Sequence, residues 1–228
     1  MIIAIDGPSG AGKSTLGRMI ARELSLLYID TGAMYRAAAL AVIESGVDAS
    51  DSEAVARVVG RARIDLEGGP DSLRVMLDGR DVSSEIRTEE VSRASSVIST
   101  IPEVRRTLVQ CQREMGERAQ SGVVLDGRDI GTVVFPRADV KFFLTAQPEA
   151  RARRRFEEDR LKARDHTTFE ETLADINTRD QRDSTRDDSP LRMAEDAIVI
   201  DSTELSIEDV FERMMETIRG RQAKTSVE

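Results

Sequence analysis

The chain has 228 residues, 39% of them apolar and 33% charged, which suits one α/β domain carrying an insertion. Its net charge of −9 argues against a nucleic-acid partner, because phosphate backbones are bound by an excess of lysine and arginine. A single cysteine, Cys111, excludes an internal disulfide framework, and a single histidine, His166, argues against a zinc site.

Short apolar runs alternate with helical patterns along the chain. The runs at residues 1–5, 26–29, 123–125, 140–145 and 197–200 predict buried strands. Helical periodicity follows the first run, at Leu16, Ile20 and Leu24. A last helix is expected to be capped by Ser206 and to end at Gly220. The alternation predicts one parallel sheet covered on both faces, with a ligand crevice at the carboxyl ends of its strands.

The glycine-rich turn GPSGAGKST, residues 7–15, matches G-x-x-x-x-G-K-[ST] between a predicted strand and a predicted helix. In such a turn backbone N–H groups point at phosphate oxygens, Lys13 reaches the β- and γ-phosphates, and the Ser14 hydroxyl holds Mg²⁺. An ordinary turn of small residues is the structural alternative. The context favours ATP binding by Gly7, Pro8, Ser9, Gly10, Ala11, Gly12, Lys13, Ser14 and Thr15, with Ser14 as the metal ligand.

The segment YIDTGAMYR, residues 28–36, directly follows the second predicted strand. Asp30 and Thr31 can cap the next helix, which puts Thr31, Tyr35 and Arg36 in its first turns, facing the strand ends. Tyr35 in the core and Arg36 in solvent are the structural alternative. We favour a role for this segment in holding the phosphate of a second substrate.

Residues 63–82 break the alternation of strands and helices. Apolar and charged residues alternate at the start of the segment, a Gly-Gly-Pro-Asp-Ser turn follows, and Asp78 with Gly79 favours a type I′ hairpin. The segment predicts a small antiparallel unit grafted onto the α/β core. Two helices are expected after it, one following Thr88 and one opening at Pro102.

A phosphate-binding turn of this kind occurs in GTPases, ATP-driven motors and kinases. The chain has no Asn-Lys-x-Asp sequence for reading guanine, and its third predicted strand leads into Asp126-Gly127-Arg128-Asp129 rather than Asp-Glu. These differences favour a small kinase. Phosphoryl transfer brings the negative charges of two substrates together, so arginines should line the site.

One candidate arginine group is Arg151, Arg154 and Arg155 on a single predicted helix. An unpaired cluster of this kind would be relieved by a triphosphate and would suit a lid that closes over the site. A solvated helix face is the alternative. His166, in the polar segment beyond, is predicted at the surface.

A second group, Arg179, Asp183 and Arg186, has the spacing i, i+4 and i+7. If one helix continues through all three, they lie within a band of about 60°. The alternative is a surface ion pair of little energetic value. The spacing alone does not decide between them.

Five stretches together resemble the bacterial cytidylate kinase family. They are IDGPSGAGKST, YIDTGAMYR, DGRDIGTVVFP, RDQRDSTR and DSTELSIEDV, which occur in that order across nearly the whole chain. The resemblance implies a P-loop nucleoside monophosphate kinase fold of the α/β class, with a five-stranded parallel sheet, an antiparallel β insert and a helical lid. It also implies transfer of the γ-phosphoryl group of ATP, with Mg²⁺, to CMP or dCMP.

Carried over by position, the resemblance implies roles for individual residues. The catalytic residues would be Lys13, Arg179 and Arg186, and ATP would also contact Arg151, Arg154 and Arg155. CMP would be bound by Thr31, Tyr35, Arg36, Ser96, Arg105, Asp126, Arg128, Asp129, Arg179, Asp183 and Arg186. Ser96, Arg105 and Asp129 would read the cytosine edge, and Asp183 would accept from the ribose hydroxyls. Asp126 would order water on Mg²⁺ or, alternatively, support Arg128.

The resemblance further implies how one kinase domain is divided. Residues 1–36, 121–150 and 187–228 would form the core, residues 37–120 the region that binds the nucleoside monophosphate, and residues 151–170 the lid. Ser14 stands where some family members have glycine and Thr31 where others have serine, and both changes leave a hydroxyl in place.

Two other functions stay open on the sequence alone. One is another small P-loop kinase, acting on UMP, shikimate or dephospho-coenzyme A. The other is a nucleotide-binding switch without catalysis, against which the arginine groups argue. No apolar run approaches the roughly 18 residues of a membrane span, and no secretory signal is visible. We therefore expect a cytoplasmic monomer whose partners are ATP and CMP or dCMP, with no membrane or nucleic acid.

Overall fold

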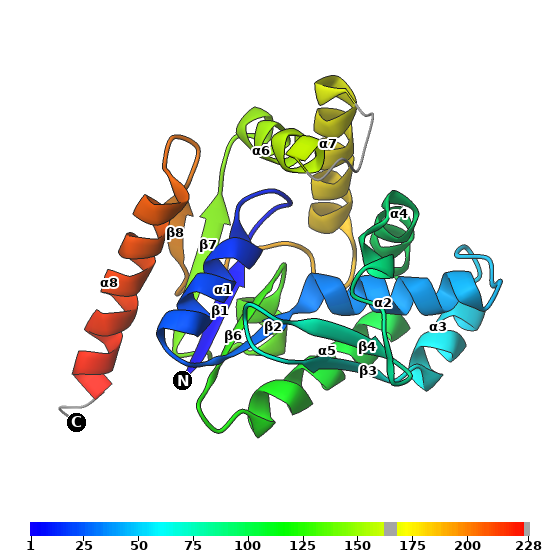
Figure 1. Cartoon of the computed structure of the whole chain (residues 1–228), viewed down its shortest axis with the longest axis horizontal. Coiled ribbons are helices and arrows are strands. Elements are labelled where there is room, and N and C mark those ends of the chain that lie inside the picture. Colours follow the sequence, from blue (N-terminus) through cyan, green and yellow to red (C-terminus); the bar gives the residue numbers. More distant parts are fainter. Residues whose placement is uncertain (162–167, 226–228) are drawn as a thin grey trace.

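The computed structural model describes residues 1–161 and 168–225 and contains a five-stranded parallel sheet. Its strands are β1 (Ile2–Asp6), β2 (Leu27–Asp30), β6 (Val123–Gly127), β7 (Val140–Thr145) and β8 (Ile198–Asp201). They lie in the order β2-β6-β1-β7-β8, and every neighbouring pair is parallel (Figure 1). The predicted sheet is confirmed, and each strand lies within two residues of its expected bounds.

Alternate residues of the strands face two separate hydrophobic cores. Ile3 and Ile5 of β1 pack on one face with α1 (Lys13–Glu23) and α8 (Ile207–Thr225). Ala4 points to the other face, where α2 (Thr31–Glu44) and α5 (Pro102–Arg118) lie. Both faces are therefore covered, which explains why the strands are apolar throughout rather than at every second residue.

A second, antiparallel sheet confirms the predicted insert. It consists of β3 (Ile64–Glu67), β4 (Arg74–Leu77) and β5 (Arg80–Asp81). Asp78 and Gly79 have φ of 52° and 83°, the left-handed pair that a type I′ turn requires. The turn between β3 and β4 reaches back to α1, where Asp71 pairs with Arg22.

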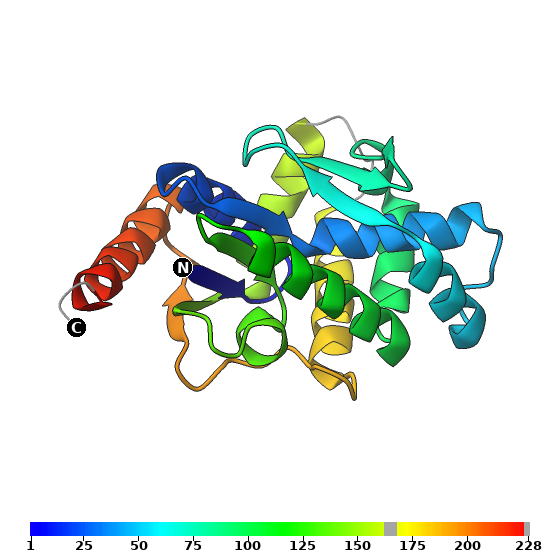
Figure 2. The same ribbon diagram turned by 90° about the horizontal axis from the view of Figure 1, so that it is seen from below.

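Several helices surround the insert. They are α3 (Ser52–Arg61), the short 3₁₀-helix η1 (Glu85–Arg87) and α4 (Glu89–Ile98). Thr88 caps α4 and Pro102 opens α5, as predicted. The helix α3 was not predicted, although Val55 and Val59 are buried on one of its faces. Figure 2 shows α3 and α8 at opposite ends of the molecule.

The helices α6 (Pro148–Leu161) and α7 (Phe169–Thr185) pack against each other above the carboxyl ends of the strands (Figure 1). Residues 162–167 of the predicted lid, His166 among them, lie outside the described residues. The helix α7 carries Arg179 and Asp183 but ends at Thr185, and Arg186 is extended, with ψ of 143°, so the condition of one helix through all three residues is not met. The Asp-Asp-Ser-Pro run that follows favours a turn over a continued helix.

The last helix, α8, begins as predicted and ends later than predicted. The Ser206 hydroxyl accepts from the backbone N–H of Asp209 at 3.1 Å and so caps the helix. Gly220 does not end it, because its φ is not in the left-handed region that a terminating glycine adopts, and the helix continues to Thr225. Residues 226–228 lie outside the described part of the chain. Among the described helices, none has the length and apolar character needed to cross a bilayer.

Candidate active site

A cavity of about 680 Å³ opens at the carboxyl ends of the strands, between the glycine-rich turn, α2, α4, α6 and α7. Most of the predicted site residues line it: Ser9, Gly10, Gly12, Lys13, Ser14, Thr15, Thr31, Tyr35, Arg36, Ser96, Arg105, Asp126, Arg128, Asp129, Arg154, Arg155, Arg179, Asp183 and Arg186. Gly7, Pro8, Ala11 and Arg151 do not. The fold therefore gathers residues from both ends of the sequence around one space.

The glycine-rich turn has the backbone that a phosphate cradle needs. Gly10 and Gly12 are left-handed, with φ of 76° and 91°. At Gly7, an added Cβ would lie 2.1 Å from the carbonyl oxygen of Leu144 on β7, so a larger residue would push the turn off the sheet. The turn can then direct its N–H groups into the cavity at the start of α1.

Lys13 is the first residue of α1 and is buried under the turn. Its Nζ donates to the carbonyl oxygen of Pro8 at 2.7 Å. Burial, and after it the nearby Arg128 guanidinium, lower the pKa of the Lys13 ammonium. A phosphate group in the turn would supply the negative charge that this ammonium lacks.

Asp126, at the end of β6, is bonded to the turn rather than to Arg128. Its carboxylate accepts from the Ser14 hydroxyl at 2.8 Å and from the Tyr28 hydroxyl at 2.6 Å. The Thr31 hydroxyl donates to the Asp126 main-chain oxygen at 2.6 Å. Burial raises the pKa of the Asp126 carboxyl. Tyr28 was missed because it lies within an apolar run, where its hydroxyl has no distinguishing pattern.

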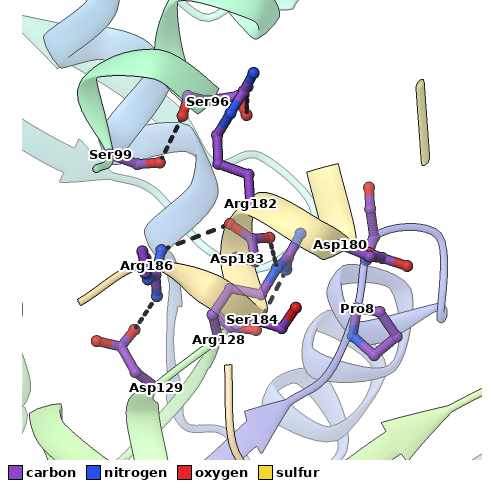
Figure 3. Close-up of polar contacts among 12 residues, drawn as sticks. Pro8, Ser96, Ser99, Arg128, Asp129, Asp180, Arg182, Asp183, Ser184 and Arg186 are labelled. Atoms are coloured by element: carbon purple, nitrogen blue, oxygen red, sulfur yellow. Dashed lines mark hydrogen bonds and ion pairs between the residues drawn. The ribbon is translucent and has the colours of Figure 1, made fainter. Parts of the chain in front are cut away.

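A network of buried charges lies on the opposite side of the cavity (Figure 3). Arg128 donates from Nε to Asp183 at 2.7 Å, and Arg186 lies 3.6 Å from the other Asp183 oxygen. Arg186 also lies 3.9 Å from Asp129, whose carboxylate accepts a short hydrogen bond from Arg105. Three guanidinium groups thus share two carboxylates. Burial, and then repulsion from Arg105, lower the pKa of Arg186. The two carboxylates therefore do not fully compensate the positive charge of the three guanidinium groups.

Three buried polar atoms in this network have no hydrogen-bond partner: Tyr35 OH, Arg105 Nε and Arg186 Nη2. The Arg105 guanidinium also lies over the Tyr35 ring, 5.6 Å from its centre. Buried polar groups in native proteins are normally satisfied, so a polar ligand or water would be expected to bond these three atoms.

Asp30 organises the start of α2. It caps the helix by accepting from the Ala33 N–H at 2.8 Å, as predicted. Arg36 and Arg18 lie on either side of its carboxylate, at 3.7 and 3.6 Å. Arg18 lines the cavity but was not predicted, although it follows Ser14 by one turn of the helix after the glycine-rich motif.

Arg179, on α7, lines the same cavity. Burial, and then repulsion from Arg155 and Arg128, lower its pKa. It forms no ion pair with another described residue. An anion between Arg179, Arg155 and Arg128 would relieve this repulsion.

The three arginines of α6 are not unpaired, because each of them has its own hydrogen-bond partner. Arg151 is buried and donates to the carbonyl oxygen of Ser9 at 3.0 Å. Arg154 donates to the loop between β8 and α8. Arg155 bonds Asp159, one turn along the helix, at 2.9 Å. Arg154 and Arg155 still face the cavity, whereas Arg151 supports the glycine-rich turn from behind.

Asp180 joins the two helices α6 and α7 to the glycine-rich turn. One of its oxygens accepts from the Ser9 N–H at 3.3 Å, and the other pairs with Arg151. Figure 3 shows Asp180 beside Pro8. The sequence contains no signal for this contact beyond the position of Asp180 in the RDQRDSTR stretch.

Asp6, at the end of β1, holds the turn that follows β6. Its carboxylate accepts from the N–H groups of Ile130 and Gly131 at 2.8 and 2.7 Å. Burial raises the pKa of Asp6 to about 6. The contact fixes the backbone next to Asp129, and Asp6 was not among the predicted site residues.

Comparison with known proteins agrees with this geometry. The family model for cytidylate kinase matches residues 3–220. The chain belongs to the cytidylate kinase family. A cytidylate kinase from Geobacter sp. (strain M21) is 48% identical over 225 residues, which cover 98% of this chain and 95% of that protein. One from Caldanaerobacter subterraneus subsp. tengcongensis is 51% identical over 217 residues, with 95% and 94% coverage.

Membership of the cytidylate kinase family makes the chain a P-loop phosphotransferase, and ATP-dependent phosphoryl transfer is the reaction type of such kinases. A solved structure of an uncharacterized protein from Eubacterium ventriosum ATCC 27560 has a TM-score of 0.54, covers 96% of this chain and 98% of its own, and is 10% identical. That likeness concerns the fold alone.

Proposed function

We propose that this chain transfers the γ-phosphoryl group of ATP to CMP or dCMP, with Mg²⁺. The observation that carries the proposal is the single cavity in which a phosphate-binding turn faces a surplus of arginines and a buried Arg105–Asp129 pair. Donor phosphates would bind at one end of this cavity and a nucleotide acceptor at the other. The names of the relatives support cytidine nucleotides as acceptors.

At the donor end, the glycine-rich turn and Lys13 would bind the phosphates of ATP, with Arg154 and Arg155 from α6. Arg151 would act through the turn. The Ser14 hydroxyl and the Asp126 carboxylate, 2.8 Å apart, offer the oxygen ligands that Mg²⁺ prefers, directly or through water. Bound Mg²⁺ would neutralise charge on the phosphates.

At the acceptor end, the cationic residues Arg36, Arg128, Arg179 and Arg186 would bind the phosphate of CMP, and Asp183 would accept from the ribose. The base would lie against Ser96, Arg105 and Asp129, with Tyr35 beside them. Asp129 suits the N4 amino group of cytosine, and the serine and arginine suit its N3 and O2 acceptors. Thr31 would keep the acceptor next to Asp126.

The reaction requires no covalent intermediate and no general base. The phosphate oxygen of CMP is anionic at neutral pH and can attack in line. The protein therefore contributes positioning of the two substrates and neutralisation of their negative charge. Lys13, Arg179 and Arg186 are the residues proposed to stabilise the group in transfer. This explains how the site works without histidine or cysteine.

The proposed division of the chain follows the same geometry. Residues 37–120, with the antiparallel sheet, would bind the monophosphate. Residues 151–170 would act as the lid over a core of residues 1–36, 121–150 and 187–228. The part of the lid at residues 162–167 lies outside the described residues. A monomeric, cytoplasmic protein stays a prediction.

The test is ADP release from Mg²⁺-ATP with CMP, dCMP, UMP, AMP, GMP and shikimate as acceptors. We expect turnover confined largely to CMP and dCMP. Preferred turnover of UMP or shikimate would replace the proposal with another small-molecule kinase. No turnover with any acceptor, while ATP still binds, would favour a nucleotide-binding switch.

A further inference from the structure

Arg182 is an arginine of α7 that was not predicted as a site residue. Its Nη1 donates to the Ser96 hydroxyl oxygen on α4 at 2.7 Å, linking helices 86 residues apart in the chain. Figure 3 shows Arg182 extending from α7 towards Ser96. Ser96 lines the cavity, whereas Arg182 does not. Arg182 is therefore placed to act on a bound ligand through Ser96.

The hydrogen bond from Arg182 determines whether the Ser96 hydroxyl acts as a donor or as an acceptor towards other groups. A guanidinium group only donates, so the Ser96 oxygen must be the acceptor and its own proton stays available. The Ser99 hydroxyl, at the C-cap of α4, and the Thr100 hydroxyl beyond it donate to carbonyl oxygens three residues back, at 3.0 and 2.8 Å. Ser96 donates to no acceptor within the described part of the chain. Arg182 therefore fixes the Ser96 oxygen and leaves the hydroxyl proton for a group in the cavity.

We propose that Arg182 is a positioning residue that makes Ser96 a hydrogen-bond donor to the acceptor base and so favours cytosine over uracil. The inference rests on the proposed function, in which Ser96 faces the base. Cytosine N3 is an acceptor, whereas uracil N3 carries a hydrogen. A hydroxyl that accepts from Arg182 still has its proton to donate and one lone pair left. Donating to cytosine N3 gives that proton a partner, whereas accepting from uracil N3–H leaves the proton without one.

The experiment compares kcat and KM for CMP and UMP in the wild type, Arg182→Ala, Ser96→Ala and the double variant. Arg182→Ala should lower kcat/KM for CMP roughly tenfold, mainly through KM, and should lower that for UMP less. The KM for ATP should stay unchanged. Since both residues act through one hydroxyl, the double variant should lose no more than Ser96→Ala alone.

Two controls separate this role from a general one. Arg93→Ala removes the same charge from an exposed ion pair on α4, with Glu89, and should leave the CMP to UMP ratio unchanged. Arg182→Lys keeps a donor and should restore part of the ratio. An unchanged ratio in Arg182→Ala, or additive losses in the double variant, would overturn the inference while leaving CMP kinase activity in place. A wild type that does not phosphorylate CMP would overturn the proposed function itself.

Discussion

Lys13 is expected to matter for catalysis while contributing little to the stability of the fold. It is buried with one hydrogen bond to Pro8, and burial already disfavours its charge. We therefore expect Lys13→Ala to reduce kcat by about a thousandfold or more, as loss of a preorganised charge does. The variant should remain folded, because a group whose charge is disfavoured adds little stability. Steady-state kinetics and thermal unfolding check both parts, and a near-normal kcat would refute the phosphate-cradle assignment.

Asp6 gives a prediction for stability against pH. Burial raises its pKa from 3.8 to about 6, so the folded state holds the proton more tightly than the unfolded state. Its stabilising contribution is full below pH 3.8 and is lost as pH rises through 6. The unfolding free energy of the wild type relative to Asp6→Asn should fall by up to about 3 kcal/mol between pH 4 and pH 7. Urea titrations across this range measure it, and a flat difference would contradict it.

For single residues, membership of the site could be predicted from the sequence better than the contacts that each residue makes. Lys13 and Ser14 are fixed by a local motif whose spacing carries its own chemistry. The Arg128–Asp183 pair joins positions 55 residues apart, and no local pattern connects them. Tyr28 and Asp6 were missed for the same reason, since the partners of each lie on distant segments.

At the scale of elements, α6 and α7 are attached to the glycine-rich turn through Asp180. Removing this carboxylate leaves the buried Arg151 without its ion-pair partner, at a site where unpaired charge is costly. We expect Asp180→Ala to lower the unfolding free energy by about 2–3 kcal/mol. It should also raise the KM for ATP more than that for CMP, because Ser9 loses its contact with α7. Urea unfolding and initial-rate kinetics with each substrate varied in turn measure the two effects.

A matched control is available on α3. Glu53→Ala removes one carboxylate from an exposed ion pair with Arg57 and should cost a few tenths of a kcal/mol. A loss of the same small size in Asp180→Ala would show that the contact does not hold the helices to the turn.

Element types could be predicted from the sequence more reliably than element ends. The five core strands are short and mainly apolar runs, and the hairpin dipeptide Asp78-Gly79 strongly favours a type I′ turn. The end of α8 was wrong because Gly220 signals termination only when its surroundings favour the left-handed form. The spacing of Arg179, Asp183 and Arg186 left the end of α7 open, and the turn that follows ends the helix at Thr185.

At the scale of the whole molecule, the charge of the chain and the charge of its cavity have opposite signs. The protein carries a net charge of −9, yet more cationic than carboxylate side chains line the cavity. Attraction of a nucleotide therefore depends on local fields inside the cavity rather than on the surface as a whole. Composition alone led us to expect no nucleic-acid partner, but the fold was needed to show where the arginines gather.

Tyr35 lines this cavity, and Tyr28 lies behind it, bonded to the lining residue Asp126. Tyr28 is bonded to Asp126 under the Ser14 hydroxyl, and Tyr35 lies beneath Arg105 at the acceptor end. Because the sequence contains no tryptophan and no third tyrosine, the near-ultraviolet absorbance and emission of the protein come from these two rings and the weaker phenylalanines. The protein therefore carries an intrinsic optical probe near each proposed substrate position, and single Tyr→Phe replacements would assign a ligand-induced signal to one end or the other.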